Sequence, residues 1–246
     1  DATEPVQSVR EKYGYIRDWN VHLVNNMNGL FEDKVNFNED ISDWNVSNVA
    51  EMTSMFYYST KFNQDISDWN VSNVKDVQYM FRNASEFNQP IGKWDISNVK
   101  NMRSMFNNTH KFNQPLNDWN TSNVTDMMLL FDTTVSFNHP IENWDVSNVA
   151  EMYGLFSMAQ VFNQPLDNWN VSNVKRMEAL FESASLFNQP LDNWDVSNVT
   201  TIDKMFEKAS LFNQPLNNWD VSNVTTMDRM FYDTVLFNQP LDNWKT

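Results

Sequence analysis

The sequence predicts an α/β repeat fold, a solenoid of similar 25-residue coils stacked along one axis. Three observations predict it: the spacing of the tryptophans, the spacing of the phenylalanines, and a change of apolar period inside each repeat. The ten tryptophans lie 25 residues apart, from Trp19 to Trp244. The eighteen phenylalanines form two series with the same period, starting at Phe31 and Phe37. Large side chains on a fixed period are typical of coils that stack like residues on like.

Each coil is expected to contain a short parallel strand followed by a short helix. Trp194 and Val196 alternate with polar neighbours, and a period of two suits a strand with one buried face. From Val199 to Phe206 the apolar residues recur at spacings of three and four, which suits a helix of two or three turns. Asn198 stands between the two elements and is a suitable N-cap for that helix.

A proline-containing segment is expected to return the chain to the start of the next coil. It reads Phe187-Asn188-Gln189-Pro190 in one repeat, and most coils have the same four residues. Proline has no backbone donor for a sheet, so the segment is predicted to be an extended connection rather than a central strand.

The chain divides into a short N-terminal segment and a long repeat array. Residues 1–17 lie outside the repeat and are predicted to cap its first coil, because an end coil must cover its apolar edge. Residues 18–246 form the array, in which the first coil, 18–42, is atypical and the coils that follow are regular. The pattern stops in mid-repeat at the C-terminus, so we expect a truncated array.

One segment of each coil resembles a known repeat. The pattern Leu191-x-x-Trp194-x-Val196-x-Asn198 is similar to the conserved segment of leucine-rich repeats. The full 25-residue repeat, over residues 18–244, resembles that of BspA-type leucine-rich-repeat surface proteins and related mycoplasma surface lipoproteins. The resemblance implies a leucine-rich-repeat-like solenoid of about nine to ten coils, export to the cell surface, a role in adhesion and no enzymatic activity.

Composition excludes several kinds of partner. The chain carries 32 acidic and 17 basic residues, a net charge of −15, and its basic residues are scattered. Nucleic acid and anionic membranes are therefore not expected partners. The absence of cysteine excludes disulfides, thiolate zinc sites and a cysteine nucleophile. No apolar run approaches the roughly 20 residues that span a bilayer, so membrane insertion is not expected.

No motif in the sequence indicates catalysis, and no cofactor is expected. His22, His110 and His139 lie on three different phases of the repeat, several coils apart, so stacking does not gather them into one cluster. A calcium ion shared by Asp195 and Asp220 is a weaker alternative, because the ligands follow no closed-loop pattern.

Two polar residues recur on the predicted strand, and we call their rows the polar strip. The strip is the candidate partner-binding face and comprises Asn45, Ser47, Asn70, Ser72, Asp95, Ser97, Asn120, Ser122, Asp145, Ser147, Asn170, Ser172, Asp195 and Ser197. Neighbouring coils of a parallel stack lie roughly 5 Å apart, so these side chains would form regular ladders. A solvated face with hydrogen bonds between coils explains the same pattern.

The sequence favours an extracellular adhesion module that recognises a protein or a glycan through the polar strip. The alternative is a structural spacer that projects another domain from the cell surface. The uniformity of the strip suits a spacer equally well, because a specific binder more often varies its contacts from coil to coil. A periodic ligand such as a polysaccharide, a mineral or ice is a third reading. The chain is expected to be a monomer or to associate weakly end to end.

Overall fold

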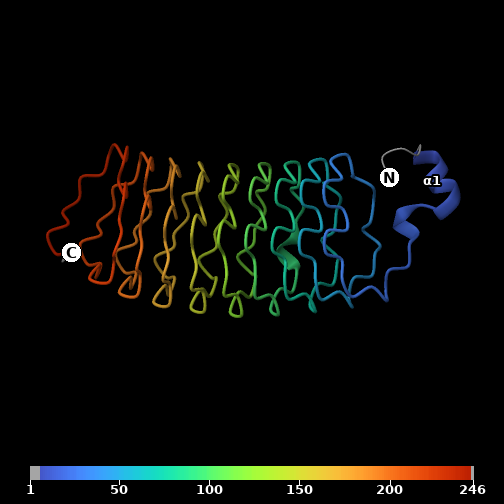
Figure 1. Cartoon of the computed structure of the whole chain (residues 1–246), viewed down its shortest axis with the longest axis horizontal. Coiled ribbons are helices and arrows are strands. Elements are labelled where there is room, and N and C mark those ends of the chain that lie inside the picture. Colours follow the sequence, from blue (N-terminus) through green and yellow to red (C-terminus); the bar gives the residue numbers. More distant parts are fainter. Residues whose placement is uncertain (1–5, 245–246) are drawn as a thin grey trace.

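A computed structural model of the protein describes residues 6–244, which form a stack of coils along the long axis of the molecule (Figure 1). The helix α1 (Val6–Tyr13) lies at the N-terminal end of the stack. A 3-10 helix, η1 (Ile16–Asp18), follows it, and a second, η2 (Ile91–Lys93), lies within a later coil. The first five residues of the predicted cap lie outside the described residues, as do the last two residues of the predicted array.

The prediction of an α/β solenoid, with a strand and a helix in each leucine-rich-repeat-like coil, is wrong. Between residues 6 and 244 the coils contain turns, isolated bridges and the short η2, but no strand and no α-helix. One parallel bridge joins each pair of neighbouring coils, from Asn26 with Glu51 to Thr201 with Thr226. The stack is therefore held by many short contacts rather than by a continuous sheet.

Consecutive turns replace the predicted helix. In the second coil, the N–H groups of Ser54, Phe56 and Tyr58 donate to carbonyls of the third coil at 2.9 to 3.0 Å. The residues between them close turns inside their own coil, as when the Tyr57 N–H donates to the Ser54 carbonyl at 3.1 Å. Ser54 and Tyr58 both have a φ of 56°, and this left-handed conformation ends each turn and starts the next. N–H groups thus alternate between the next coil and the same coil.

Stacked phenylalanine rings explain why no helix forms in each coil. The ring centroids of Phe56 and Phe81, in neighbouring coils, are 5.5 Å apart, and those of Phe62 and Phe87 are 5.9 Å apart. Packed helices need an interaxial distance of about 8 to 10 Å. The coil spacing that the rings impose is therefore too small for one helix beside the next. Apolar spacings of three and four mark turns here, because turns also bury every third or fourth side chain.

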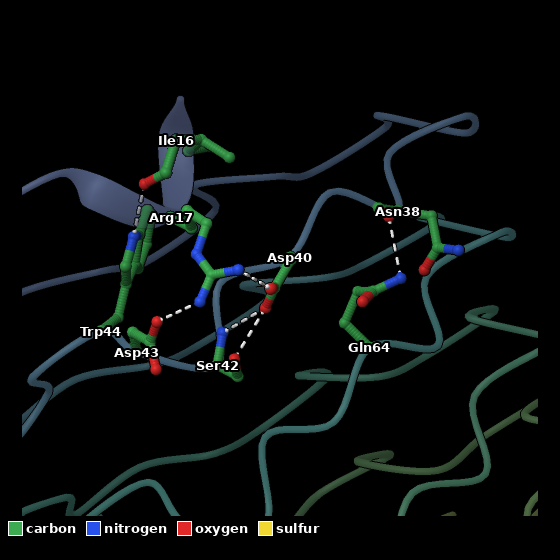
Figure 2. A network of polar contacts seen from close by, with 8 residues as sticks. All are labelled: Ile16, Arg17, Asn38, Asp40, Ser42, Asp43, Trp44 and Gln64. Carbon is green, nitrogen blue, oxygen red and sulfur yellow. Dashed lines mark hydrogen bonds and ion pairs between the residues drawn. The ribbon is translucent and has the colours of Figure 1, made fainter. Parts of the chain in front are cut away.

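Rows of asparagine and glutamine add side-chain bonds between coils. The backbone N–H of Asn63 donates to the Oδ1 atom of Asn38 at 2.9 Å, and Nε2 of Gln64 donates to the Asn38 carbonyl at 2.9 Å (Figure 2). The same bonds recur with a period of 25 residues along the stack, for example from Asn188 to Asn163. Asn73, at the predicted N-cap position, instead donates its Nδ2 to the carbonyl of Ser47 in the preceding coil at 2.7 Å.

The segment before the first regular coil is tied to it by polar contacts. Arg17 forms ion pairs with Asp40, at 3.0 Å, and with Asp43 (Figure 2). Nε1 of Trp44 donates to the Ile16 carbonyl at 2.8 Å, so the backbone of η1 occupies the place that a preceding coil has for later tryptophans. These contacts position η1 at the N-terminal end of the core.

Candidate functional site

The polar strip forms local turns rather than ladders. Oδ1 of Asn45 accepts the backbone N–H of Ser47 at 3.1 Å and its hydroxyl at 2.7 Å. The Ser97 hydroxyl and then its backbone N–H stabilise the Asp95 carboxylate and lower its pKa, and Ser147 does the same for Asp145. The Asn and Asp side chains of the strip are exposed, whereas its serines are half-buried.

Every coil of the strip makes this same local contact. The backbone N–H of each serine lies 2.9 to 3.2 Å from Oδ1 of the Asn or Asp two residues before it, for the pairs that begin at Asn45, Asn70, Asp95, Asn120, Asp145, Asn170 and Asp195. Part of the strip's hydrogen-bonding capacity is therefore used within the protein. The uniform Asn or Asp residue has a structural reason, because the turn requires it.

The histidines lie apart, as expected from their phases. His22 contacts Asn20 in its own coil, Nε2 of His139 lies 3.1 Å from the Asn113 carbonyl, and His110 is exposed. In the part of the chain that the structure describes, no group of three or more His, Asp or Glu residues is arranged to hold a metal ion. None of the described helices is long and apolar enough to cross a membrane.

A second surface is lined by side chains that differ from coil to coil. We call it the outer face, and it consists of the side chains that do not point into the core within residues 51–58, 76–83, 101–108, 126–133, 151–158, 176–183, 201–208 and 226–233. Most of them are partly exposed, whereas Ser104, Asn107, Ser157 and Glu207 are buried. In these segments Met52, Met55 and Phe56 and their counterparts point inward and are mostly buried. The turns direct the remaining residues outward.

The row that begins at Tyr57 shows this variation most clearly. Its members in successive coils are Tyr57, Arg82, Asn107, Asp132, Ser157, Glu182, Glu207 and Tyr232. These residues directly follow the stretch that was predicted to be helical, and they were not assigned to the binding face from the sequence. This position changes residue type from coil to coil, whereas most positions of the repeat keep the same one. Packing between coils would allow the same residue here in every coil.

Aromatic rings surround an arginine at the N-terminal part of the outer face. The guanidinium carbon of Arg82 lies 5.7 Å from the ring centroid of Tyr57 and 5.6 Å from that of Tyr79. The Tyr58 ring meets the Tyr57 ring edge to face at 4.7 Å. Such cation–π contacts hold a guanidinium in place without neutralising it.

The middle of the row is a hydrogen-bonded polar group. Nδ2 of Asn107 donates to Oδ2 of Asp132 at 2.6 Å, and the Thr133 hydroxyl donates to Oδ1 at 3.1 Å. Burial raises the pKa of Asp132, while the hydrogen bonds from Thr133, Ser157 and Asn107 act in the opposite direction. The Asp132 carboxylate is thus sheltered, and hydrogen bonds from its neighbours use much of its capacity to accept.

The C-terminal part of the outer face is acidic. Arg176 donates to Oε1 of Glu178 at 2.8 Å, and its guanidinium lies 3.7 Å from Glu151. Glu207 is only 4% exposed, and its contact with Lys208 is long, at 4.0 Å. Burial and, among the nearby charges, Glu207 raise the pKa of Glu182. Negative charge on this part of the face is therefore only partly compensated.

Sheltered polar atoms without a hydrogen-bond partner gather on the outer face. Among the described residues there are seven such atoms, and six of them belong to this face: Arg82 Nε, Asn83 Nδ2, Ser104 Oγ, Glu151 Oε2, Glu178 Oε2 and Glu207 Oε2. The seventh is Oδ1 of Asp192. An unpaired buried polar atom costs about 1 to 3 kcal/mol. The nitrogen donors lie at the tyrosine-rich part of the face and the carboxylate acceptors at the acidic part.

A family model described as "Mycoplasma protein of unknown function, DUF285" matches residues 3–118, 89–185 and 159–246. The three matches together extend over nearly the whole chain. The chain belongs to this family. No curated protein matches it.

Membership of the DUF285 family agrees with the repeat architecture. The three matches overlap and follow one another along the array, as expected when one repeat pattern recurs many times. The family supports a repeat protein of mycoplasma type. It does not extend to the BspA-type leucine-rich repeat in particular.

Proposed function

We propose that this DUF285 protein is a non-enzymatic binding module, exposed at the cell surface, that recognises a protein partner through the outer face. The observation that carries the proposal is the gathering of six sheltered, unpartnered polar atoms on that face. A partner can satisfy these atoms where binding moves the side chains that cover them, and it then removes their cost.

Rigidity of the frame supports the same proposal. Two stacked series of phenylalanines and the asparagine rows hold each coil against the next, so the outer side chains are pre-organised. Binding to a pre-organised surface loses less conformational entropy than binding to mobile loops. The resemblance to BspA-type surface proteins adds an expectation of adhesion and of an extracellular location.

A structural spacer is the second candidate function, and the polar strip favours it. The strip repeats one residue pair in nearly every coil, and each pair closes a turn in its own coil. A spacer needs only such uniform turns. A spacer does not require the variation of the outer face.

The two surfaces can be separated by two matched sets of substitutions. The outer-face variant combines Tyr58→Asn, Met158→Asn and Lys208→Asn, three exposed residues with φ of 55 to 59°. Asparagine tolerates the left-handed conformation, so the turns are expected to survive. The strip variant combines Ser122→Lys with Asp145→Lys, in two adjacent coils.

Both variants and the unchanged protein would be measured against a panel of purified extracellular-matrix proteins and glycans. Circular dichroism would establish that all three are folded. We expect saturable binding of the unchanged protein to a protein ligand, weakened at least about tenfold in the outer-face variant and retained in the strip variant. Loss in the strip variant alone would move the site to the polar strip, and no binding by any folded protein would favour the spacer.

A further inference from the structure

In the described part of the chain three arginines form ion pairs with carboxylates, and three form none: Arg82, Arg103 and Arg229. Arg10, Arg17 and Arg176 lie within 4.0 Å of a carboxylate. Arg82 has no such contact, although the chain has almost two acidic residues for each basic one. A protein this acidic has many carboxylates with which an arginine could pair.

The surroundings of Arg82 hold its guanidinium in a fixed, partly dry position. The rings of Tyr57 and Tyr79 lie within 6 Å of it, and its Nε atom is sheltered from solvent without an acceptor. Nδ2 of Asn83, the next residue, is also a sheltered donor without a partner. Two unpaired donors on adjacent residues beside a positive charge call for an acceptor that is negatively charged.

Asp132 does not fill this role. It attracts the Arg82 guanidinium across the row, but it accepts its hydrogen bonds from Asn107 and Thr133. No ion pair joins it to Arg82 within 4.0 Å. No described residue supplies the acceptor that these two donors lack.

We propose that Arg82 forms a carboxylate-binding site for an acidic side chain on a protein partner. Its Nε atom and Nδ2 of Asn83 are sheltered, so the terminal guanidinium nitrogens make the two-pronged contact with the two oxygens of the carboxylate. Tyr58, which is 41% exposed, offers an apolar ring beside the site. This proposal rests on the proposed function, because it assigns a ligand to one part of the outer face.

A protein carboxylate fits the surroundings better than an acidic polysaccharide does. Glu151, Glu178, Glu182 and Glu207 lie further along the same face. A polyanionic chain running along the stack would be repelled by these carboxylates, whereas a single acidic side chain meets only the positive part of the face. A protein surface can also present basic groups to the acidic part.

Nuclear magnetic resonance of the Arg82 Nε–H group tests the site directly. The full chain would be titrated with a capped tripeptide that has a central glutamate, with the same peptide carrying glutamine, and with glucuronate. We expect a saturable shift of the Arg82 Nε–H resonance with the glutamate peptide, a much smaller one with the glutamine peptide, and weaker binding of glucuronate.

Substitutions of Arg82 test whether binding requires the planar guanidinium group or only a positive charge. R82Q removes the site and R82K keeps the charge but loses the planar fork, so both are expected to weaken glutamate-peptide binding about tenfold or more, followed through the amide resonances of residues 79–83. K100Q removes one positive charge from the following coil, outside the outer face, and is expected to leave binding unchanged. The amide spectrum of each variant would show that it is folded.

The outcomes are distinct from those of the panel experiment. An equal loss in K100Q, or no response of Arg82 to any carboxylate, would overturn the carboxylate site while leaving the outer face as a binding surface through its other residues. Tighter binding of glucuronate than of the peptide would overturn the assignment to a protein partner. A response of Arg82, with panel binding that survives in the outer-face variant, would support the site and count against the broader proposal.

Discussion

Nε1 of Trp194 donates a hydrogen bond of 2.9 Å to the carbonyl of Leu166, 28 residues earlier and in the preceding coil. The same bond joins tryptophan to the preceding coil all along the array, from Trp69 with Ile41 to Trp244 with Leu216. Each tryptophan thus fills the core of one coil and fixes its distance from the last. Each tryptophan of the repeat therefore has two structural roles: it fills the core, and it sets the register between neighbouring coils.

Replacing one central tryptophan by phenylalanine tests the registration. Trp144 is 3% exposed, and its Nε1 lies 2.9 Å from the Leu116 carbonyl. Trp144→Phe is expected to lower the free energy of unfolding by about 1 to 2 kcal/mol, because it removes a buried donor and part of a buried ring. Urea denaturation measures this. Trp19→Phe is the control, because Trp19 is 43% exposed, and it is expected to lower the free energy of unfolding by less than about 0.5 kcal/mol. Equal losses at Trp144 and Trp19 would contradict the prediction.

Substitutions at two residues with a left-handed backbone conformation are expected to change the stability in opposite directions. Gly154 has a φ of 59°, and an added Cβ would lie 2.6 Å from Cδ2 of Leu129. Gly154→Ala is expected to cost about 1 to 2 kcal/mol. Met158 has a φ of 55° and is 45% exposed, so Met158→Asn is expected to stabilise by a few tenths of a kcal/mol.

Thermal unfolding of both variants, beside Gln160→Asn at an exposed residue without positive φ, checks these signs. A stabilisation by Gln160→Asn as large as that by Met158→Asn would show that the backbone conformation is not the cause. An unchanged melting temperature in Gly154→Ala would show that the turn yields without strain.

Glu182 predicts a loss of stability as pH rises. Burial and, among the nearby charges, Glu207 raise its pKa above the ordinary value of 4.5, so the folded protein holds this proton more tightly than the unfolded chain. Its contribution to stability is therefore complete below pH 4.5 and is lost as pH rises through the folded pKa. Glu182→Gln cannot ionise and is expected to be more stable than the unchanged protein at pH 7, with the difference vanishing in acid. A constant difference across this range would contradict the prediction.

Asp145 predicts the opposite pH dependence. The Ser147 hydroxyl and backbone N–H lower its pKa below the ordinary value of 3.8, so ionisation stabilises the fold. This contribution is present above pH 3.8 and is lost as pH falls through the folded pKa. Asp145→Asn keeps the Oδ1 acceptor but cannot be protonated. It is therefore expected to abolish the part of the acid-induced loss of stability that comes from protonation of this carboxylate. Denaturant midpoints measured from pH 2 to 6 would test this, and identical acid profiles for both proteins would contradict it.

Particular residues show where sequence reasoning succeeded and where it failed. The buried tryptophans and phenylalanines lie in rows with a 25-residue period, as their spacing indicates. The stretch from Val199 to Phe206 was predicted to be helical, yet Lys204 has a φ of 58° and the chain there forms turns. Helices and successive turns both bury every third or fourth side chain, so the apolar pattern does not distinguish them.

The candidate site depended even more on the structure. The polar strip was visible as a uniform row, but its aspartates and asparagines accept hydrogen bonds from serines of the same coil. The contacts of Arg82 with Tyr57 and Tyr79 join residues from two successive coils. Sequence indicates that these residues vary, whereas the rings around the guanidinium are known only from the folded chain.

The sequence by itself determined the repeat: its length of 25 residues, the residues that face the core, and the stacking of like on like. Only the tertiary structure decided the backbone path within each coil. Neighbouring phenylalanine rings lie 5.5 to 6.2 Å apart along the stack, which leaves too little space for adjacent helices. The N–H groups of residues such as Ser54 and Phe56 therefore bond to the next coil, while those between them close turns. Contacts between coils thus set the local conformation that the sequence of a single coil leaves open.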